Sequence, residues 1–136
     1  MINLGQKFYY LKHIFIFPLV ILLIGTSCQS PPERNCTNFK EGTFSFSEII
    51  DGDTLTTKFI RKDGIEIDFF NGNRDTSAVR WINDCEYILK KKNPNSKAEE
   101  RPIQIKILTT TDSSYTFEYN IVGEPKKLRG TAIKTN

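Results

Sequence analysis

Apolar side chains recur at every second residue in short runs between Thr43 and Lys134, and this spacing constrains the fold more than any other feature. A period of two puts alternate side chains on opposite faces of a β-strand, whereas an amphipathic helix needs a period of about 3.6. In the clearest run, Tyr115, Phe117, Tyr119 and Ile121 alternate with polar residues. We therefore expect about eight strands, over residues 43–49, 55–61, 65–70, 78–82, 85–91, 103–108, 115–121 and 127–134.

Turn residues separate these runs. Asp63-Gly64 between two alternating runs predicts a tight hairpin, and Asn71-Gly72-Asn73 predicts a further turn. Short connections join antiparallel neighbours, and the apolar face of such a sheet has to be covered. Eight strands is about the number at which a barrel closes. We expect an all-β fold: an antiparallel up-and-down meander that forms a small barrel or a curled sheet, lipocalin-like in shape.

The first 27 residues differ in composition from the rest of the chain. They contain Lys7 and Lys12 but no acidic residue, and the 11 residues 14–24 carry no polar side chain. A helix of that length spans about 16 Å, roughly half of a bilayer core of about 30 Å. The segment 1–27 therefore indicates a cleaved signal peptide rather than a transmembrane helix.

Cys28 directly follows this segment. The residues Gly25-Thr26-Ser27-Cys28 resemble the lipobox of bacterial lipoproteins, in a loose form similar to that of Bacteroidetes. The resemblance implies a lipid on Cys28 and anchoring to a membrane. Gly25 stands where the motif usually has an aliphatic residue, so the alternative is an ordinary secretory signal cut near Ser27.

A lipidated Cys28 implies a particular organisation of the mature chain. Residues 28–41 would be the modified cysteine and a polar, proline-containing tether, and residues 42–136 a single β domain. Gln29 after the cysteine favours the outer membrane of the cell envelope. Only Glu33 is acidic in the tether, so the periplasmic face is favoured over the cell surface.

Cys36 and Cys85 are the two other cysteines of the chain. In an oxidising envelope compartment two such cysteines usually form a disulfide, which would close a loop of about 50 residues. The alternative is a pair of buried, unreactive thiols, because Cys85 alternates with Tyr87 and Leu89 on an apolar face.

The composition argues against several functions. Without residues 1–27 the chain has 17 basic and 16 acidic residues, a net charge of +1, so we expect no nucleic-acid partner. The only histidine, His13, lies in the signal segment, which excludes Ser/His and Cys/His nucleophile pairs from the mature chain. Asp51-Gly52-Asp53 does not continue as a calcium loop and is interpreted as a turn. We therefore predict no catalytic residue, metal or cofactor, and a protein that is not an enzyme.

Two segments together resemble a family of small uncharacterised lipoproteins of flavobacteria and related Bacteroidetes. Cys36 with Phe39-Lys40, Gly42 and Phe44 matches the pattern C-x-x-F-K-x-G-x-F, and residues 81–89 match W-x-x-D-C-x-Y-x-L. The resemblance implies a lipid anchor and a compact β domain, and no known activity. Some relatives carry a topoisomerase IV label, which does not fit a secreted chain of this size without a basic groove.

The predicted function is a membrane-tethered accessory protein that binds another envelope protein, because about a hundred residues in eight strands leave little interior volume. The alternative is a lipocalin-like barrel that binds an apolar ligand. Most aromatic residues on the strands are expected in the core. If a ligand is bound, the candidate contacts are Trp81, Tyr87, Phe117 and Tyr119.

Overall fold

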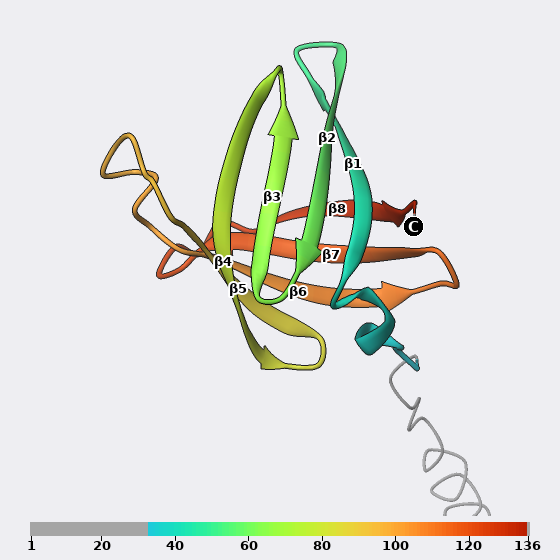
Figure 1. Cartoon of the computed structure of the whole chain (residues 1–136). Helices are drawn as coiled ribbons and strands as arrows, with labels where there is room; N and C mark the ends of the chain where they lie inside the picture. The colour runs from blue at the N-terminus through green and yellow to red at the C-terminus, as the bar shows by residue number, and fades with distance from the viewer. Residues whose placement is uncertain (1–32, 136) are drawn as a thin grey trace, which may run out of the picture. The chain divides into compact units, whose positions relative to one another are not determined.

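The computed structural model describes residues 33–135. They form an all-β barrel in which eight antiparallel strands follow one another in chain order, and β8 pairs with β1 to close it (Figure 1). The predicted up-and-down meander is thus confirmed, as a closed barrel. The strands are β1 (Gly42–Ile50), β2 (Asp53–Lys62), β3 (Ile65–Phe70), β4 (Asn73–Asn83), β5 (Glu86–Lys91), β6 (Ile103–Thr110), β7 (Ser114–Ile121) and β8 (Leu128–Lys134).

A short 3-10 helix, η1 (Cys36–Phe39), precedes the first strand and covers one end of the barrel (Figure 1). Cys36 and Phe39 lie within the segment 28–41 that the sequence assigned to the tether, yet both are buried in the core. One compact unit spans Pro32–Asn136 and contains every strand of the sheet. The predicted signal peptide and Cys28 lie outside the described residues. Among residues 33–135, no helix is long and apolar enough to cross a membrane.

β3 departs from the expectation that the apolar face of each strand points inward. The predicted hairpin turn, Asp63–Gly64, has positive φ at both residues, 50° and 72°, and it pairs Arg61 with Glu66 across the two strands. Directly paired residues share a face of the sheet. Because Arg61 is buried inside, Glu66 and Asp68 also face inward. The apolar residues Ile65, Ile67 and Phe69 therefore lie on the outer face.

β4 begins five residues earlier than the alternation predicted, at Asn73 instead of Ala78. Its first half is polar, so it shows no apolar period in the sequence. It is nevertheless fully paired with β3, and Ser77 is buried. This polar half-strand lines the barrel interior near the cavity described below.

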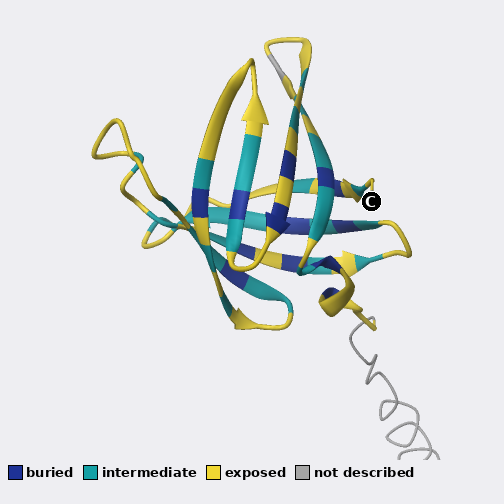
Figure 2. Ribbon diagram, viewed as in Figure 1, coloured by how far each residue is buried: buried dark blue, intermediate teal, exposed yellow. Residues whose placement is uncertain are grey.

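The core is concentrated toward the end that η1 covers. Figure 2 shows the buried residues of β1 to β4 in the middle and lower parts of these strands, whereas the hairpin tips of β1–β2 and β3–β4 are exposed. Aromatic rings fill this region, with Phe44 and Phe59 stacked 5.0 Å apart. The buried apolar cluster consists of Cys36, Phe39, Phe44, Phe59, Tyr87, Ile105, Ile107, Tyr115, Phe117 and Ala132.

Candidate ligand-binding site

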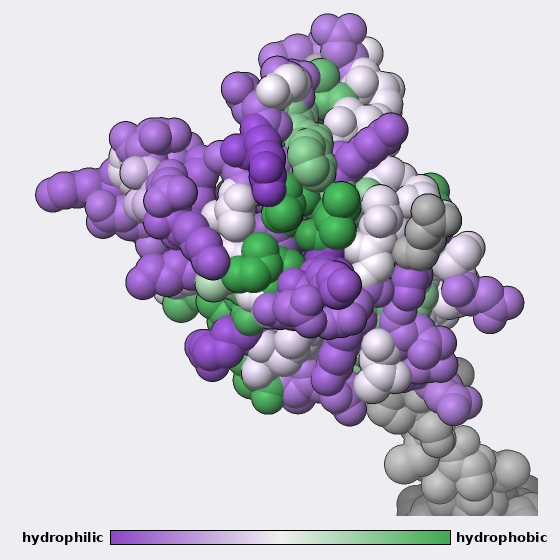
Figure 3. Space-filling model, in the orientation of Figure 1, coloured by the Kyte–Doolittle hydropathy of each residue, from purple (hydrophilic) through white to green (hydrophobic). Residues whose placement is uncertain are grey.

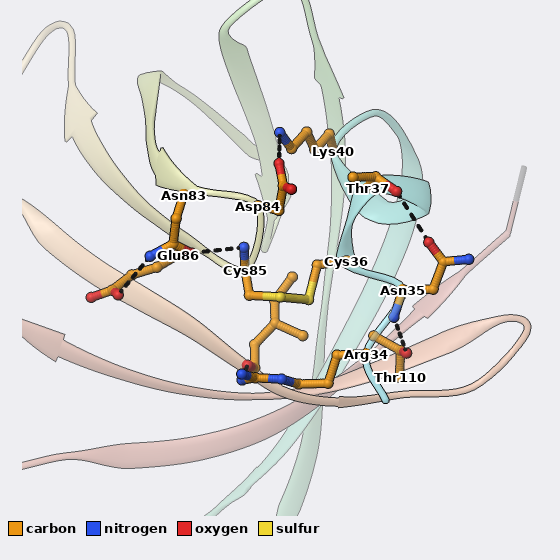
Figure 4. Close-up of a disulfide and its surroundings, with 11 residues drawn as sticks. Arg34, Asn35, Cys36, Thr37, Lys40, Asn83, Asp84, Cys85, Glu86 and Thr110 are labelled. Carbon is orange, nitrogen blue, oxygen red and sulfur yellow. Dashed lines mark hydrogen bonds and ion pairs between the residues drawn. A yellow bond between two sulfur atoms is a disulfide. The ribbon is translucent and has the colours of Figure 1, made fainter. Parts of the chain in front are cut away.

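A disulfide between Cys36 and Cys85 fastens η1 to the β4–β5 turn (Figure 4). The predicted pairing is therefore present. Lys40 forms an ion pair with Asp84 at 2.7 Å, one residue before Cys85. Arg34 donates a hydrogen bond to the carbonyl oxygen of Ile107 at 2.8 Å. Helix η1 and its flanking residues are thus held by two contacts to the β4–β5 turn and one to β6, and they cover this end of the barrel.

Arg61 fills the interior directly above η1. Its guanidinium donates to Glu66 Oε2 at 2.7 Å, to the Phe39 carbonyl at 2.9 Å, and to the hydroxyls of Tyr87 and Tyr115 at 2.6 and 3.2 Å. Burial disfavours its charged form, but the surrounding groups reverse this effect, and the pKa of Arg61 lies above its usual value. Burial raises the pKa of Tyr87 well above the ordinary range. This buried polar cluster forms a floor between η1 and the open half of the barrel.

A cavity of about 550 Å³ opens above this floor. Its size lies within the roughly 300–1,000 Å³ that is typical of small-molecule sites. The expectation that the strands leave little interior volume is therefore wrong for this half of the barrel. Strands β1 to β7 and the β5–β6 loop contribute to its walls, and β8 does not.

The walls of the cavity are apolar over much of their area. Aromatic and aliphatic side chains of several strands pack side by side in the lining, and the rings of Phe46 on β1 and Phe117 on β7 meet edge to face at 5.3 Å between centroids. Such walls bury the hydrocarbon part of a ligand. The apolar lining residues are Phe46, Phe59, Leu89, Ala98, Ile103, Ile105, Phe117 and Ile121, joined by Tyr87, Tyr115 and Tyr119.

Carboxylates line one side of the cavity. Asp68 of β3 and Asp75 of β4 are direct cross-strand partners and face each other. Asp75 also forms an ion pair with Lys91 at 3.0 Å, and Lys91 contacts Glu99 at the same distance. On another wall, Glu48 accepts a hydrogen bond of 2.5 Å from the Tyr119 hydroxyl. Like charges directly opposite each other on a sheet are destabilising, so the pairing of Asp68 with Asp75 requires an explanation.

Asp68 has the most perturbed carboxyl group in the cavity. Its pKa is raised to about 7, chiefly because burial disfavours the anion and because Glu66 adds repulsion, while Arg61 acts in the opposite direction. Within the part of the chain that the structure describes, no side chain forms an ion pair with it. A titratable group with such a shift inside a cavity is typical of a functional site.

The structure brings three of the four aromatic residues suggested as ligand contacts to the cavity. Tyr87, Phe117 and Tyr119 line it. Trp81 does not, because it lies at the covered end, 4.5 Å from the Tyr87 ring and beneath the Lys40 ammonium. Cys28, the predicted lipidation site, lies outside the described residues.

Sequence reasoning missed the polar side of the cavity. Glu66 and Asp68 look like solvent-facing positions of β3, and Asp75 lies in a stretch without alternation. A signal was present in the length of the hairpin: two residues between Lys62 and Ile65 fix the register and therefore place Glu66 opposite Arg61. Within residues 33–135, no group of three or more His, Cys, Asp or Glu side chains is arranged to hold a metal ion.

Comparison of the chain with protein-family models and with curated protein sequences finds no match. The site is therefore interpreted from its own geometry. That geometry is a barrel covered at one end, with an apolar cavity and a row of carboxylates in its other half.

Proposed function

We propose that this protein is a membrane-tethered binding protein that holds a small molecule in the open half of its barrel. The single observation that supports the proposal most strongly is the cavity of about 550 Å³ above the Arg61 floor. Apolar walls with a few convergent polar groups are the usual composition of a small-molecule site. A lipid anchor at Cys28 would keep the barrel, and hence its ligand, at the surface of an envelope membrane.

Uptake of a neutral hydrophobic dye, N-phenyl-1-naphthylamine, tests the binding site. Thr57 and Thr56 are neighbours on β2, but Thr57 lines the cavity and Thr56 is exposed outside. We expect saturable uptake of about one dye per barrel, abolished by Thr57→Trp and unchanged by Thr56→Trp. Equal uptake in both variants would place the dye on the outer surface and contradict the proposal.

Metabolic labelling with palmitate tests the anchor. The full chain should incorporate the label and remain with the membranes of its host. Cys28→Ala should abolish the label and release the protein into the soluble fraction, whereas Ser27→Ala should leave both unchanged. Unchanged labelling of Cys28→Ala would exclude this cysteine as the anchor.

A second candidate function, binding of an envelope protein, is supported by an apolar patch on the outer face of β2 and β3. Figure 3 shows hydrophobic residues gathered in the middle of the visible face, over these strands. Ile60 pairs with Ile67, and both Ile60 and Phe69 are about 40% exposed. Cross-linking in membranes should capture one defined partner, and Ile60→Lys with Phe69→Lys should abolish the capture while dye uptake persists.

A further inference from the structure

The charges of the cavity are unbalanced. Five carboxylates line it, against two basic side chains, Lys91 and Arg101. Arg61 in the floor neutralises one carboxylate, Lys91 is shared between two, and Arg101 forms its ion pair with Glu124 outside the cavity lining. The five carboxylates are Glu48, Glu66, Asp68, Asp75 and Glu99.

Two carboxylates, Glu48 and Asp68, therefore have no basic partner among the residues that the structure describes. Glu48 is satisfied in part by the Tyr119 hydroxyl. Asp68 has a carboxylate on each side: Asp75 faces it across the strand pair, with β-carbons about 5 Å apart for direct partners, and Glu66 lies two residues before it on the same face. Asp68 is thus the place where a positive charge would be stabilised most.

Apolar surface lies directly beside this position. Phe59 is the direct cross-strand partner of Asp68 on β2, and its ring is buried in the inner wall. Phe46 of β1 and Phe117 of β7 continue the apolar lining around the wall from β2. A ligand seated here would place one end against a carboxylate and the rest against hydrocarbon.

From this arrangement we propose that the cavity binds an organic cation, an ammonium group attached to an apolar body, with the ammonium at Asp68 and the body against Phe46, Phe59 and Phe117. The inference rests on the proposed function and specifies its ligand class. A cation between Asp68 and Asp75 removes the repulsion of the directly opposed pair. An anionic ligand would add to it.

The cation should bind more weakly at low pH. Asp68 has a pKa of about 7, and the charged groups that face it are Glu66 and Asp75, which favour its protonation, and Arg61 and Lys91, which oppose it. Below this pKa the carboxyl group becomes neutral and loses its attraction for ammonium, which stays charged up to a pH of about 10.

Three probes with the same eight-carbon chain test the proposal: octylammonium, octanol and octanoate, titrated calorimetrically into residues 32–136. This unit contains the whole closed barrel with its core and disulfide. We expect octylammonium to bind at least ten times more tightly than octanol at pH 8, and octanoate most weakly. The preference for octylammonium should fall severalfold at pH 5.5.

Asp68→Asn should reduce the preference for octylammonium over octanol to about twofold and remove its pH dependence, while octanol affinity stays the same. Asp112→Asn, which removes an equal charge from an exposed loop between β6 and β7, should leave the affinities for all three probes unchanged.

Equal affinity for all three probes, or tighter binding of octanoate, would overturn the charge assignment but leave the binding site intact. Absence of saturable binding by every probe would overturn the proposed function itself.

Discussion

At the scale of single residues, the stability of the barrel depends on a buried ion pair between Arg61 and Glu66. Arg61 and Glu66 are 1% and 3% exposed, so each has lost nearly all contact with bulk water. Burial of an ion costs several kcal/mol unless every polar atom finds a partner. Here the tyrosine hydroxyls and the Phe39 carbonyl complete the shell of the guanidinium, and no buried side-chain nitrogen or oxygen among the described residues lacks a partner.

Arg61→Met should destabilise the domain by about 3–5 kcal/mol, because Glu66 is left buried without its counter-ion. Urea unfolding measures this loss. The double variant Arg61→Met with Glu66→Gln should lose less unfolding free energy than Arg61→Met alone, since neither member of the ion pair remains buried as a charge. Lys62→Met, at the exposed next position of β2, serves as the control. Equal losses in the single and double variants would show that the isolated carboxylate is not the cause.

Asp68 should make the domain less stable as the pH rises. Its pKa is about 7 in the folded state, above the ordinary value of 3.8, so the folded state binds more protons between these values. The stabilising contribution of its proton is therefore complete below about pH 4 and is lost as the pH rises to 7. Asp68→Asn should raise the unfolding free energy at pH 8 by on the order of 1–3 kcal/mol, and much less at pH 4.

Urea midpoints at pH 4, 6 and 8 for the wild type, Asp68→Asn and Asp112→Asn measure this difference. The comparison with Asp112→Asn removes the contribution of the other carboxyl groups. A constant difference between the wild type and Asp68→Asn over this range would contradict the raised pKa.

At the scale of elements, β8 has to approach β1 and β7 closely to close the barrel. Gly130 is the cross-strand partner of Phe117, and a β-carbon there would lie 2.3 Å from Cε2 of Phe46. The Phe46 ring therefore occupies the space that a side chain on β8 would need. Closure of this seam depends on a small residue in β8 as much as on backbone pairing.

Gly130→Ala should destabilise the domain by about 1–3 kcal/mol, the usual cost of overpacking. Thermal or urea unfolding checks this value. Phe46→Leu in the same chain should recover part of the loss, because the shorter side chain leaves room for the new methyl group. If Phe46→Leu and Gly130→Ala were simply additive, the predicted clash between the two positions would be excluded.

At the scale of the whole molecule, the disulfide joins residues that are 49 positions apart and attaches η1 to the barrel. Closing a loop of this length restricts the unfolded chain, by about 4 kcal/mol in the chain-entropy account. Cys36→Ser with Cys85→Ser should lower the unfolding free energy of residues 32–136 by about 2–4 kcal/mol. Denaturing alkylation of unreduced protein from an oxidising compartment should find no free thiol, whereas two reactive thiols per molecule would contradict the bond.

The sequence by itself determined the number of strands, their order in the sheet and the turns between them, although not the polar first half of β4. Alternation in β6 and β7 and the Asp63–Gly64 hairpin are local features that depend on backbone geometry and on neighbouring residues. These local features are the same in any fold in which the strands pair antiparallel. The pairing of Cys36 with Cys85 was also predicted from the sequence, but a pair of buried thiols stayed open as the alternative, and the structure shows the bond.

Only the tertiary structure decided which face of β3 and β4 points inward and whether the interior is filled. The alternation of apolar residues in β3 predicts that Ile65, Ile67 and Phe69 are buried. The buried Arg61 instead requires a carboxylate opposite it, and the two-residue hairpin places Glu66 at that position. That register turns Asp68 and, through the next hairpin, Asp75 toward the cavity. These positions depend on pairing and burial across the whole barrel, which a local sequence pattern does not contain.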